Sequence, residues 1–287
     1  MSRKAFLASA ALCLVLAGGS ALWAAVSRPA AQSDARPRRI VSLNLCADQL
    51  VLALADRSQI AGLTRNATDT DMSGEAARAR GLPILTNSAE QILAIDPDLV
   101  IGMPARRSTA LGVLKGQGYK TLDLKSADSL DDIYASIRAT AAAVGHSDRG
   151  EAMIAGMKRD LAGLGRPGAG RVAAYYQRRG FMTGTGTLVD DLMQRMGLVN
   201  LAAKLGKPAL AQVSLEEMVA ARPDYLIVES ATSRVTDQGS EMLHHPALRD
   251  IPRISIPQAW TVCGSPAYTL AARAMAQQIV RLNGGHR

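Results

Sequence analysis

Cysteines give this 287-residue chain its clearest covalent chemistry. Cys13 lies inside an N-terminal apolar run, which leaves Cys46 and Cys263 as a pair in the rest of the chain. Such a pair can form a disulfide, bind a soft metal such as Cu(I) as thiolates, or line two loops as inert small residues. We favour the disulfide, because paired thiols are hard to keep reduced in an oxidising compartment.

Aromatic and guanidinium groups offer a second kind of chemistry, which is recognition. The chain has two tryptophans and two phenylalanines, and one of each lies beyond the N-terminal apolar run, at Trp260 and Phe181. Both follow predicted strands, as do Arg106 and Arg178. A planar guanidinium suits carboxylate, phosphate or catecholate oxygens, and aromatic rings suit a flat ligand. The pattern therefore predicts a binding site for a planar or catechol-bearing molecule.

The first 31 residues have the order of a secretory signal peptide. Arg3 and Lys4 precede an apolar run that ends in small residues. A Gly-Gly-Ser stretch interrupts the run, which disfavours a membrane-spanning helix. We therefore predict cleavage near Ala31 and export to the periplasm, which lowers the formal charge from +8 to +5.

Several other functions are disfavoured. Gly184 and Gly186 lie between a strand and a helix, but Val189 stands where a dinucleotide fold needs a small residue. The sequence has no Gly-x-Ser-x-Gly stretch, which disfavours an α/β-hydrolase. The arginines are scattered without interleaved aromatics, so we expect no nucleic-acid partner. The four histidines lack the spacing of a zinc site, so we predict no metal site and no cofactor.

A repeated unit shows which elements must position the candidate residues. "EQILAIDPDLVIG" follows Ser88, and "EEMVAARPDYLIVES" follows Ser214 and the leucine after it. Each serine can cap a helix, and Pro97 and Pro223 then end that helix before a short apolar strand. Buried strands that alternate with helices are typical of parallel sheets covered on both faces.

These elements predict an α/β fold with two Rossmann-like lobes. Each lobe has a central parallel sheet, one long α-helix joins them, and a ligand cleft lies between them. We place the signal peptide at 1–31, the N-terminal lobe at 32–145, the connecting helix at 146–168 and the C-terminal lobe at 169–287. The connecting helix should begin at the cap Ser147.

Ligands of open α/β sheets bind beyond the carboxyl ends of the strands, so these positions define the predicted cleft. They are Asn44, Leu45, Cys46, Asn66, Met103, Arg106, Tyr176, Arg178, Phe181, Thr183, Gly184, Trp260 and Cys263.

Four stretches, in chain order, carry a family resemblance: "RIVSLNLCADQLVLALAD", "EQILAIDPDLVIG", "SLEEMVAARPDYLIVES" and "HPALRDIPRISIPQAW". Together with the predicted signal peptide and connecting helix, they resemble the helical-backbone (class III) periplasmic substrate-binding proteins of ABC importers. That family carries ferric siderophores, haem and cobalamin. The resemblance implies a monomeric carrier of a metal chelate rather than an enzyme, and it leaves open which of these chelates is bound.

The resemblance also implies a role for the repeat. In this family a surface glutamate on each lobe docks to the permease dimer in the inner membrane, and Glu90 and Glu216 stand at the matching positions. Glutamates in a first helical turn also favour the helix dipole without any partner. The alternative function is a chelatase-like metal or tetrapyrrole enzyme of similar two-lobed shape, because Cys46 and His244 could bind a metal.

Overall fold

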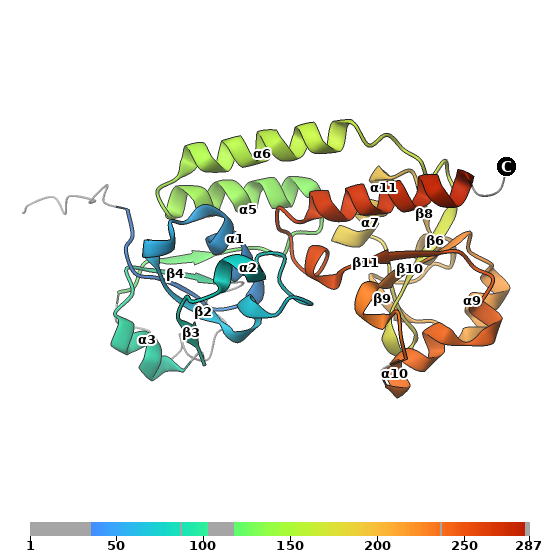
Figure 1. The fold of residues 1–287 in the computed structure, drawn as a ribbon, viewed down its shortest axis with the longest axis horizontal. Coiled ribbons are helices and arrows are strands. Elements are labelled where there is room, and N and C mark those ends of the chain that lie inside the picture. Colours follow the sequence, from blue (N-terminus) through green and yellow to red (C-terminus); the bar gives the residue numbers. More distant parts are fainter. Residues whose placement is uncertain (1–35, 87, 103–117, 236, 285–287) are drawn as a thin grey trace, which may run out of the picture. The chain divides into compact units, whose positions relative to one another are not determined.

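Two β-sheets organise the part of the chain that the computed structural model describes, which is residues 36–86, 88–102, 118–235 and 237–284 (Figure 1). The first sheet is entirely parallel and has the strand order β3-β2-β1-β4-β5. Its strands are β1 (Ile40–Ser42), β2 (Ile60–Thr64), β3 (Ile84–Leu85), β4 (Leu99–Gly102) and β5 (Thr121–Asp123).

The second sheet has the order β11-β10-β6-β7-β9, and β8 also pairs with β6. Its strands are β6 (Val172–Tyr176), β7 (Phe181–Thr183), β8 (Val199–Asn200), β9 (Leu210–Gln212), β10 (Tyr225–Glu229) and β11 (Arg253–Ile256). The pairs of β6 with β8 and β10, and of β10 with β11, are parallel, whereas β7 runs antiparallel to both β6 and β9. A tight turn at Arg178–Gly180, in which Arg179 and Gly180 both have positive φ, reverses the chain directly after β6. So short a connection can join only antiparallel neighbours.

Helices fill the connections between these strands, and the predicted α/β class is confirmed (Figure 1). They are α1 (Leu45–Leu54), α2 (Ala76–Ala79), α3 (Ala89–Ile95), α5 (Leu130–Ala143), α6 (Ser147–Ala162), α7 (Leu188–Arg195), α8 (Leu201–Lys204), α9 (Leu215–Ala221), α10 (Gln238–Glu241) and α11 (Tyr268–Gly284). Among the described residues, no helix combines the length and the apolar character needed to cross a membrane.

Helices α3 and α9 of the repeated unit begin and end as the sequence predicts. The hydroxyls of Ser88 and Ser214 each accept a backbone N–H from the first turn, at 3.2 Å in both helices. Asp96 and Arg222 end the helices in the left-handed conformation, with φ of 49° and 44°, directly before the prolines. Both halves therefore end this helix in the same way, with a left-handed residue and a proline before the next strand.

The aspartate of each Pro-Asp pair fastens the neighbouring strand. The Asp98 carboxylate accepts the backbone N–H groups of Arg38 and Arg39, at 2.7 and 2.9 Å, where the chain enters β1. The Asp224 carboxylate accepts the N–H of Val172, the first residue of β6, at 2.7 Å. Asp98 immediately precedes β4, so its hydrogen bonds hold β1 beside β4. Asp224 immediately precedes β10, so its hydrogen bond holds β6 beside β10.

The largest hydrophobic cluster contains residues from both sheets. Ile40 and Ile101 come from the first sheet, and Tyr175 and Ile227 from the second. Helices α5, α6, α7 and α11 contribute to the same cluster, and α6 contacts both α5 and α11. The far face of each sheet packs a smaller cluster of its own. A continuous core therefore links the two sheets through α5, α6, α7 and α11.

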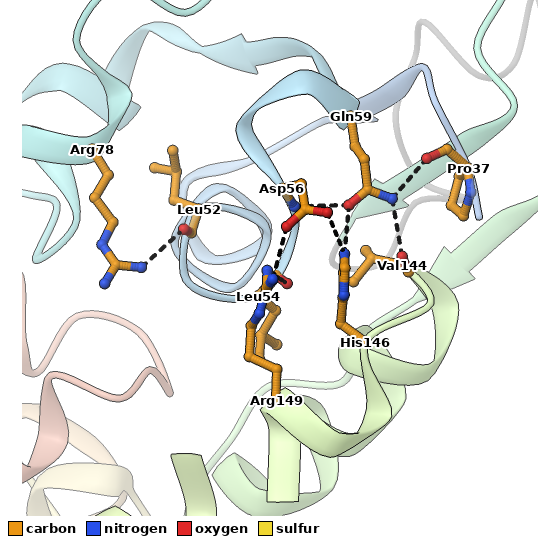
Figure 2. A network of polar contacts seen from close by, with 9 residues as sticks. All are labelled: Pro37, Leu52, Leu54, Asp56, Gln59, Arg78, Val144, His146 and Arg149. Atoms are coloured by element: carbon orange, nitrogen blue, oxygen red, sulfur yellow. Dashed lines mark hydrogen bonds and ion pairs between the residues drawn. The ribbon is translucent and has the colours of Figure 1, made fainter. Parts of the chain in front are cut away.

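A polar network anchors the start of α6 to the end of α1 (Figure 2). Arg149 donates to the carbonyl oxygen of Leu54 at 2.6 Å and pairs with the Asp56 carboxylate at 2.7 Å. The Nε2 atom of His146 lies 3.1 Å from Asp56 and 3.0 Å from the amide oxygen of Gln59. The connecting helix is thus fixed to the first half of the chain by one cation, one carboxylate and one buried imidazole.

His146 takes the place that the sequence assigned to Ser147. It precedes the first helical residue of α6 and makes no capping bond with its side chain, whereas Ser147 is already inside the helix. Burial of the ring, assisted by the nearby Arg149 charge, lowers the pKa of His146, and Asp56 opposes that shift. The hydrogen bond from Arg149 lowers the pKa of the Asp56 carboxyl.

We expect His146→Gln to weaken the dependence of stability on pH. As pH falls from about 7 to 5, an unfolded chain protonates this histidine, while the buried ring resists protonation, so the folded wild type loses stability. Glutamine does not titrate. Thermal unfolding at about pH 7.5 and pH 5 measures the effect, with the exposed His245→Gln as control. An equal loss of unfolding temperature in wild type and His146→Gln would contradict this account.

Candidate ligand-binding site

Cys46 and Cys263 form a disulfide in the structure, with their Cα atoms 5.2 Å apart and a sequence separation of 217. Cys46 lies in the first turn of α1, directly after β1, and Cys263 lies between β11 and α11. Beside the bond, a Cβ added to Gly264 would stand 2.2 Å from the Cβ of Ala127, so glycine permits this contact. The bond therefore joins the carboxyl end of a strand in each sheet, and its sulfur atoms are not free to bind a metal.

A pocket of about 280 Å³ opens beside this disulfide. Both halves of the chain contribute to it, mainly with hydroxyl, amide and carboxyl groups. Its lining residues are Cys46, Ser126, Ala127, Asp128, Tyr175, Gln177, Thr183, Thr187, Leu188, Val189, Glu229, Gln258, Thr261, Val262, Cys263 and Gly264. We call this the disulfide pocket.

A chain of hydrogen bonds crosses the disulfide pocket. The hydroxyl of Thr183 donates to the amide oxygen of Gln177 at 3.4 Å, and the Gln177 amide nitrogen donates to Glu229 at 3.2 Å. The hydroxyls of Tyr175 and Thr261 lie 3.4 Å apart on the same pocket wall. These groups come from β6, β7, the end of β10 and the loop after β11, so the second sheet positions nearly all of them.

Glu229 is the unusual member, because it is a carboxyl group with only 7% of its surface exposed. Burial raises its pKa, while the hydrogen bond from Gln177 and the charge of Arg178 oppose the shift. Burial also raises the pKa of the Tyr175 phenol, and the nearby Glu229 charge adds to that rise. The pocket therefore offers a phenol that stays protonated, next to a carboxyl group that resists ionisation.

A second hollow of about 350 Å³ adjoins the disulfide pocket. The two share Gln177, Glu229 and Gln258, and the second adds Arg178, Phe181 and Leu210. Arg178 forms an ion pair with Asp237, so its charge is already compensated. This wall therefore presents an aromatic ring and an apolar side chain rather than a free cation.

The carboxyl ends of β1, β2 and β3 surround a separate pocket of about 560 Å³. Its lining residues are Leu43, Asn44, Leu45, Thr64, Arg65, Asn66, Ile84, Leu85 and Thr86. Three predicted cleft residues, Asn44, Leu45 and Asn66, are brought together here. Asn44 is also the N-cap of α1, and its side chain accepts the N–H of Ala47 at 3.0 Å.

The structure places Tyr176 away from the disulfide pocket. Its side chain is fully buried on the far face of the second sheet, and its hydroxyl donates to the carbonyl oxygen of Val213 at 3.0 Å. Side chains alternate between the two faces of a strand, so the neighbouring Tyr175 reaches the disulfide pocket instead. The sequence located the strand end correctly but not which of its two tyrosines faces the pocket.

Two other predicted residues have structural roles. A Cβ on Gly184 would lie 2.1 Å from the carbonyl oxygen of Pro208, so this glycine permits a close backbone approach, and it is not part of the lining of the disulfide pocket. Trp260 packs against the main hydrophobic cluster, directly before Thr261 of the disulfide pocket. The predictions for Met103 and Arg106 fall outside the described residues.

Sequence reasoning missed Glu229, the carboxyl group near the end of the apolar stretch "DYLIVES". The available signal was the carboxyl group at the end of an otherwise apolar run, because an ionisable side chain is rarely buried there without a purpose.

Glu90 and Glu216 occupy the same exposed position, the second residue of α3 and of α9. Each carboxylate accepts its own backbone N–H and a bond from the capping serine, and these bonds lower its pKa. One turn further, Leu93 and Val219 are 39% and 37% exposed. Each half therefore displays a charged carboxylate beside an exposed apolar side chain, and we call these the two acidic helix starts.

Comparison with known proteins gives the family. The profile of the periplasmic binding protein family matches residues 40–254, so the chain belongs to that family. A "Cobalamin-binding protein" of Halobacterium salinarum is 23% identical over 76% of this chain and 60% of its own length. The chain thus spans about 60% of the length of these haloarchaeal relatives.

Other relatives match over most of their length. A "Vitamin B12-binding protein" of Pectobacterium carotovorum is 24% identical over 88% of this chain and 91% of its own. Among solved structures, the periplasmic heme-binding protein RhuT from Roseiflexus is 26% identical, with a TM-score of 0.68 over 85% of this chain and 98% of that one. The vitamin B12 binding protein BtuF of Vibrio cholerae has a TM-score of 0.64 at 16% identity, over 86% and 98% of the two chains.

These relatives are named as binding proteins rather than enzymes, and the pair behind the alternative function does not assemble. Cys46 is bonded to Cys263, and His244 lines a different pocket. Within the described ranges, no group of three histidine, cysteine, aspartate or glutamate side chains could hold a metal ion.

We expect Glu229→Gln to raise the unfolding temperature at about pH 8 and to change it little at about pH 4. The raised pKa means that the folded state disfavours the ionised carboxyl, a cost present only above the pKa of an unfolded glutamate. A gain of a few degrees fits a chain of this size, where 1 kcal/mol corresponds to roughly 2–4 °C. The exposed Glu241→Gln is the matched control, and a gain at pH 4 equal to that at pH 8 would argue against buried charge as the cause.

Proposed function

We propose that the chain is the substrate-binding component of an ABC importer and carries a metal chelate, with a cobalamin-type corrinoid as the preferred ligand. One observation carries the proposal: in a chain of this family, the disulfide pocket lies at the carboxyl ends of strands and draws its lining from both halves. The names of the haloarchaeal and Pectobacterium relatives support the corrinoid.

The chemistry of the disulfide pocket supports a ligand that is rich in neutral hydrogen-bonding groups. Its described lining residues include two amides and several hydroxyls, and none of them is a lysine or an arginine. Amide side chains at the edge of a corrinoid can both donate and accept, which suits Gln177, Gln258 and Thr261. A strongly anionic siderophore finds no cation in this lining.

Haem suits the lining of the disulfide pocket less well than a corrinoid does. A tyrosine binds iron best as a phenolate, but burial raises the pKa of Tyr175 and keeps its proton in place. At about 280 Å³ the pocket is smaller than most sites for drug-sized ligands, so it would receive one edge of a chelate.

Titration with chelates tests the ligand. In protein prepared without residues 1–31, Trp260 is the single tryptophan, and it directly precedes Thr261 of the pocket wall. We expect cyanocobalamin to quench its emission with 1:1 stoichiometry, and Gln177→Ala to weaken binding by about tenfold, as loss of one good hydrogen bond would. Arg281→Gln, on an exposed turn of α11, should bind normally. If cyanocobalamin, a ferric siderophore and haem all fail to change fluorescence or release heat, the proposal is wrong.

We further propose that the two acidic helix starts dock to a permease dimer. Equivalent positions on the two halves suit a partner with two-fold symmetry, which offers the same contact twice. The exposed Leu93 and Val219 give each contact an apolar component beside the carboxylate. This role places the protein in the periplasm as a monomer, with residues 1–31 as its signal peptide, 32–145 and 169–287 as lobes, and 146–168 as the connection.

Charge reversal tests the docking. We expect Glu90→Lys or Glu216→Lys to leave chelate affinity unchanged but to weaken association with the permease by about tenfold, a typical scale for a charge at an interface rim. The loss should be larger at low salt, because screening already weakens the contact at high salt. Binding-protein-stimulated ATPase activity in reconstituted importer is the measurement, and Glu241→Lys is the control. Normal stimulation by the double reversal would refute docking at these positions.

A further inference from the structure

A separate pocket of about 340 Å³ lies at the outer edge of the second sheet. It is bounded by β11, by the turn after β10 and by the short turns around residues 242–249. Its lining residues are Val228, Thr232, Ser233, His244, Arg249, Arg253 and Ser255. It shares none of these with the disulfide pocket, because Val228 and Glu229 point to opposite faces of β10.

Arg253 is a half-buried cation within this pocket. Its guanidinium donates to the carbonyl oxygen of Leu243, and no carboxylate in the described part of the chain lies within ion-pair distance of it. Burial is the single cause that shifts its pKa, which it lowers. A guanidinium partly removed from water without a neighbouring negative charge costs free energy, so this position favours an anion.

The other lining groups point to the same kind of ligand. Arg249 is exposed and makes no side-chain hydrogen bond or ion pair within the described ranges. The Nε2 atom of His244 lies 2.8 Å from the carbonyl oxygen of Thr232, which fixes the ring at the pocket edge. Ser233 and Ser255 add hydroxyl groups. The described lining thus contains two guanidiniums, an imidazole and three hydroxyls, but no carboxylate.

We propose that this pocket binds a phosphate-type oxyanion, at a site separate from the chelate. Two guanidiniums match the tetrahedral arrangement of phosphate oxygens, and the hydroxyl of Ser233 in the lining adds a further donor. Free phosphate and the phosphate of a lipid headgroup share this chemistry. The pocket is in the same half as the acidic helix start of α9, and His245, next to His244, acts electrostatically on Glu216.

Binding of inorganic phosphate and of vesicles tests the site. We expect titration of the purified protein with phosphate, against chloride at equal ionic strength, to show saturable binding that Arg249→Gln weakens by about tenfold, the scale of one charge-assisted hydrogen bond. Flotation on vesicles of phosphatidylglycerol, against vesicles of phosphatidylcholine, tests the lipid source with the same variant. Arg249→Gln is the sharper change, because Arg253 also holds Leu243 and its loss could disturb the fold.

Arg281→Gln is the matched control, since Arg281 is exposed in the same half but does not line the pocket. Phosphate binding that is lost in Arg249→Gln and kept in Arg281→Gln supports a free oxyanion. Vesicle binding with the same pattern, without binding of free phosphate, supports the lipid headgroup. Absence of both in the wild type, or equal weakening by the two variants, overturns the proposal. Chelate affinity should be unchanged in Arg249→Gln, so this test stands apart from that of the proposed function.

Discussion

The covalent link between Cys46 and Cys263 is the constraint on which the disulfide pocket depends. It ties the first turn of α1, which follows β1, to the loop after β11, and the close contact of Gly264 with Ala127 reinforces it. Parallel sheets present their ligand-binding loops at the carboxyl ends of their strands, so a bond at these ends places the loops of both sheets around one pocket. The polar groups of the second sheet then face residues 126–128 of the first half across a short distance.

Away from this link, each half is held by the same local devices. A serine begins the helix, a left-handed residue before proline ends it, and an aspartate fastens the neighbouring strand. The helix starts thereby acquire exposed carboxylates at equivalent positions, while the strand ends acquire different polar groups. Duplication of a structural unit thus explains the matching exposed carboxylates, whereas the lining of the disulfide pocket differs between the two halves.

Local signals made much of the fold predictable. Ser88, Ser214 and the Pro-Asp pairs act on their own neighbours in the chain, so the helices and strands of the repeat followed from sequence. The antiparallel strand β7 did not, because the turn after β6 depends on Arg179 adopting positive φ, which residues other than glycine rarely do. The side chain of Tyr176 lies on the opposite face of the sheet from the disulfide pocket. Side chains alternate along a strand, so a choice that is one residue off selects the wrong face. Glu229 was overlooked because its burial depends on loops that are distant in sequence.

The long separation of the two cysteines also determines when, during synthesis, the disulfide can form. Cys263 follows Cys46 by 217 residues, so a chain synthesised from its N-terminus presents Cys46 as an unpaired thiol until most of the remaining sequence has emerged. Throughout that interval the first sheet must hold its shape by packing and hydrogen bonds alone. The hydrogen bonds to the Asp98 carboxylate and the N-caps of α1 and α3 all lie within the first hundred or so residues. They can therefore form before Cys263 has been synthesised.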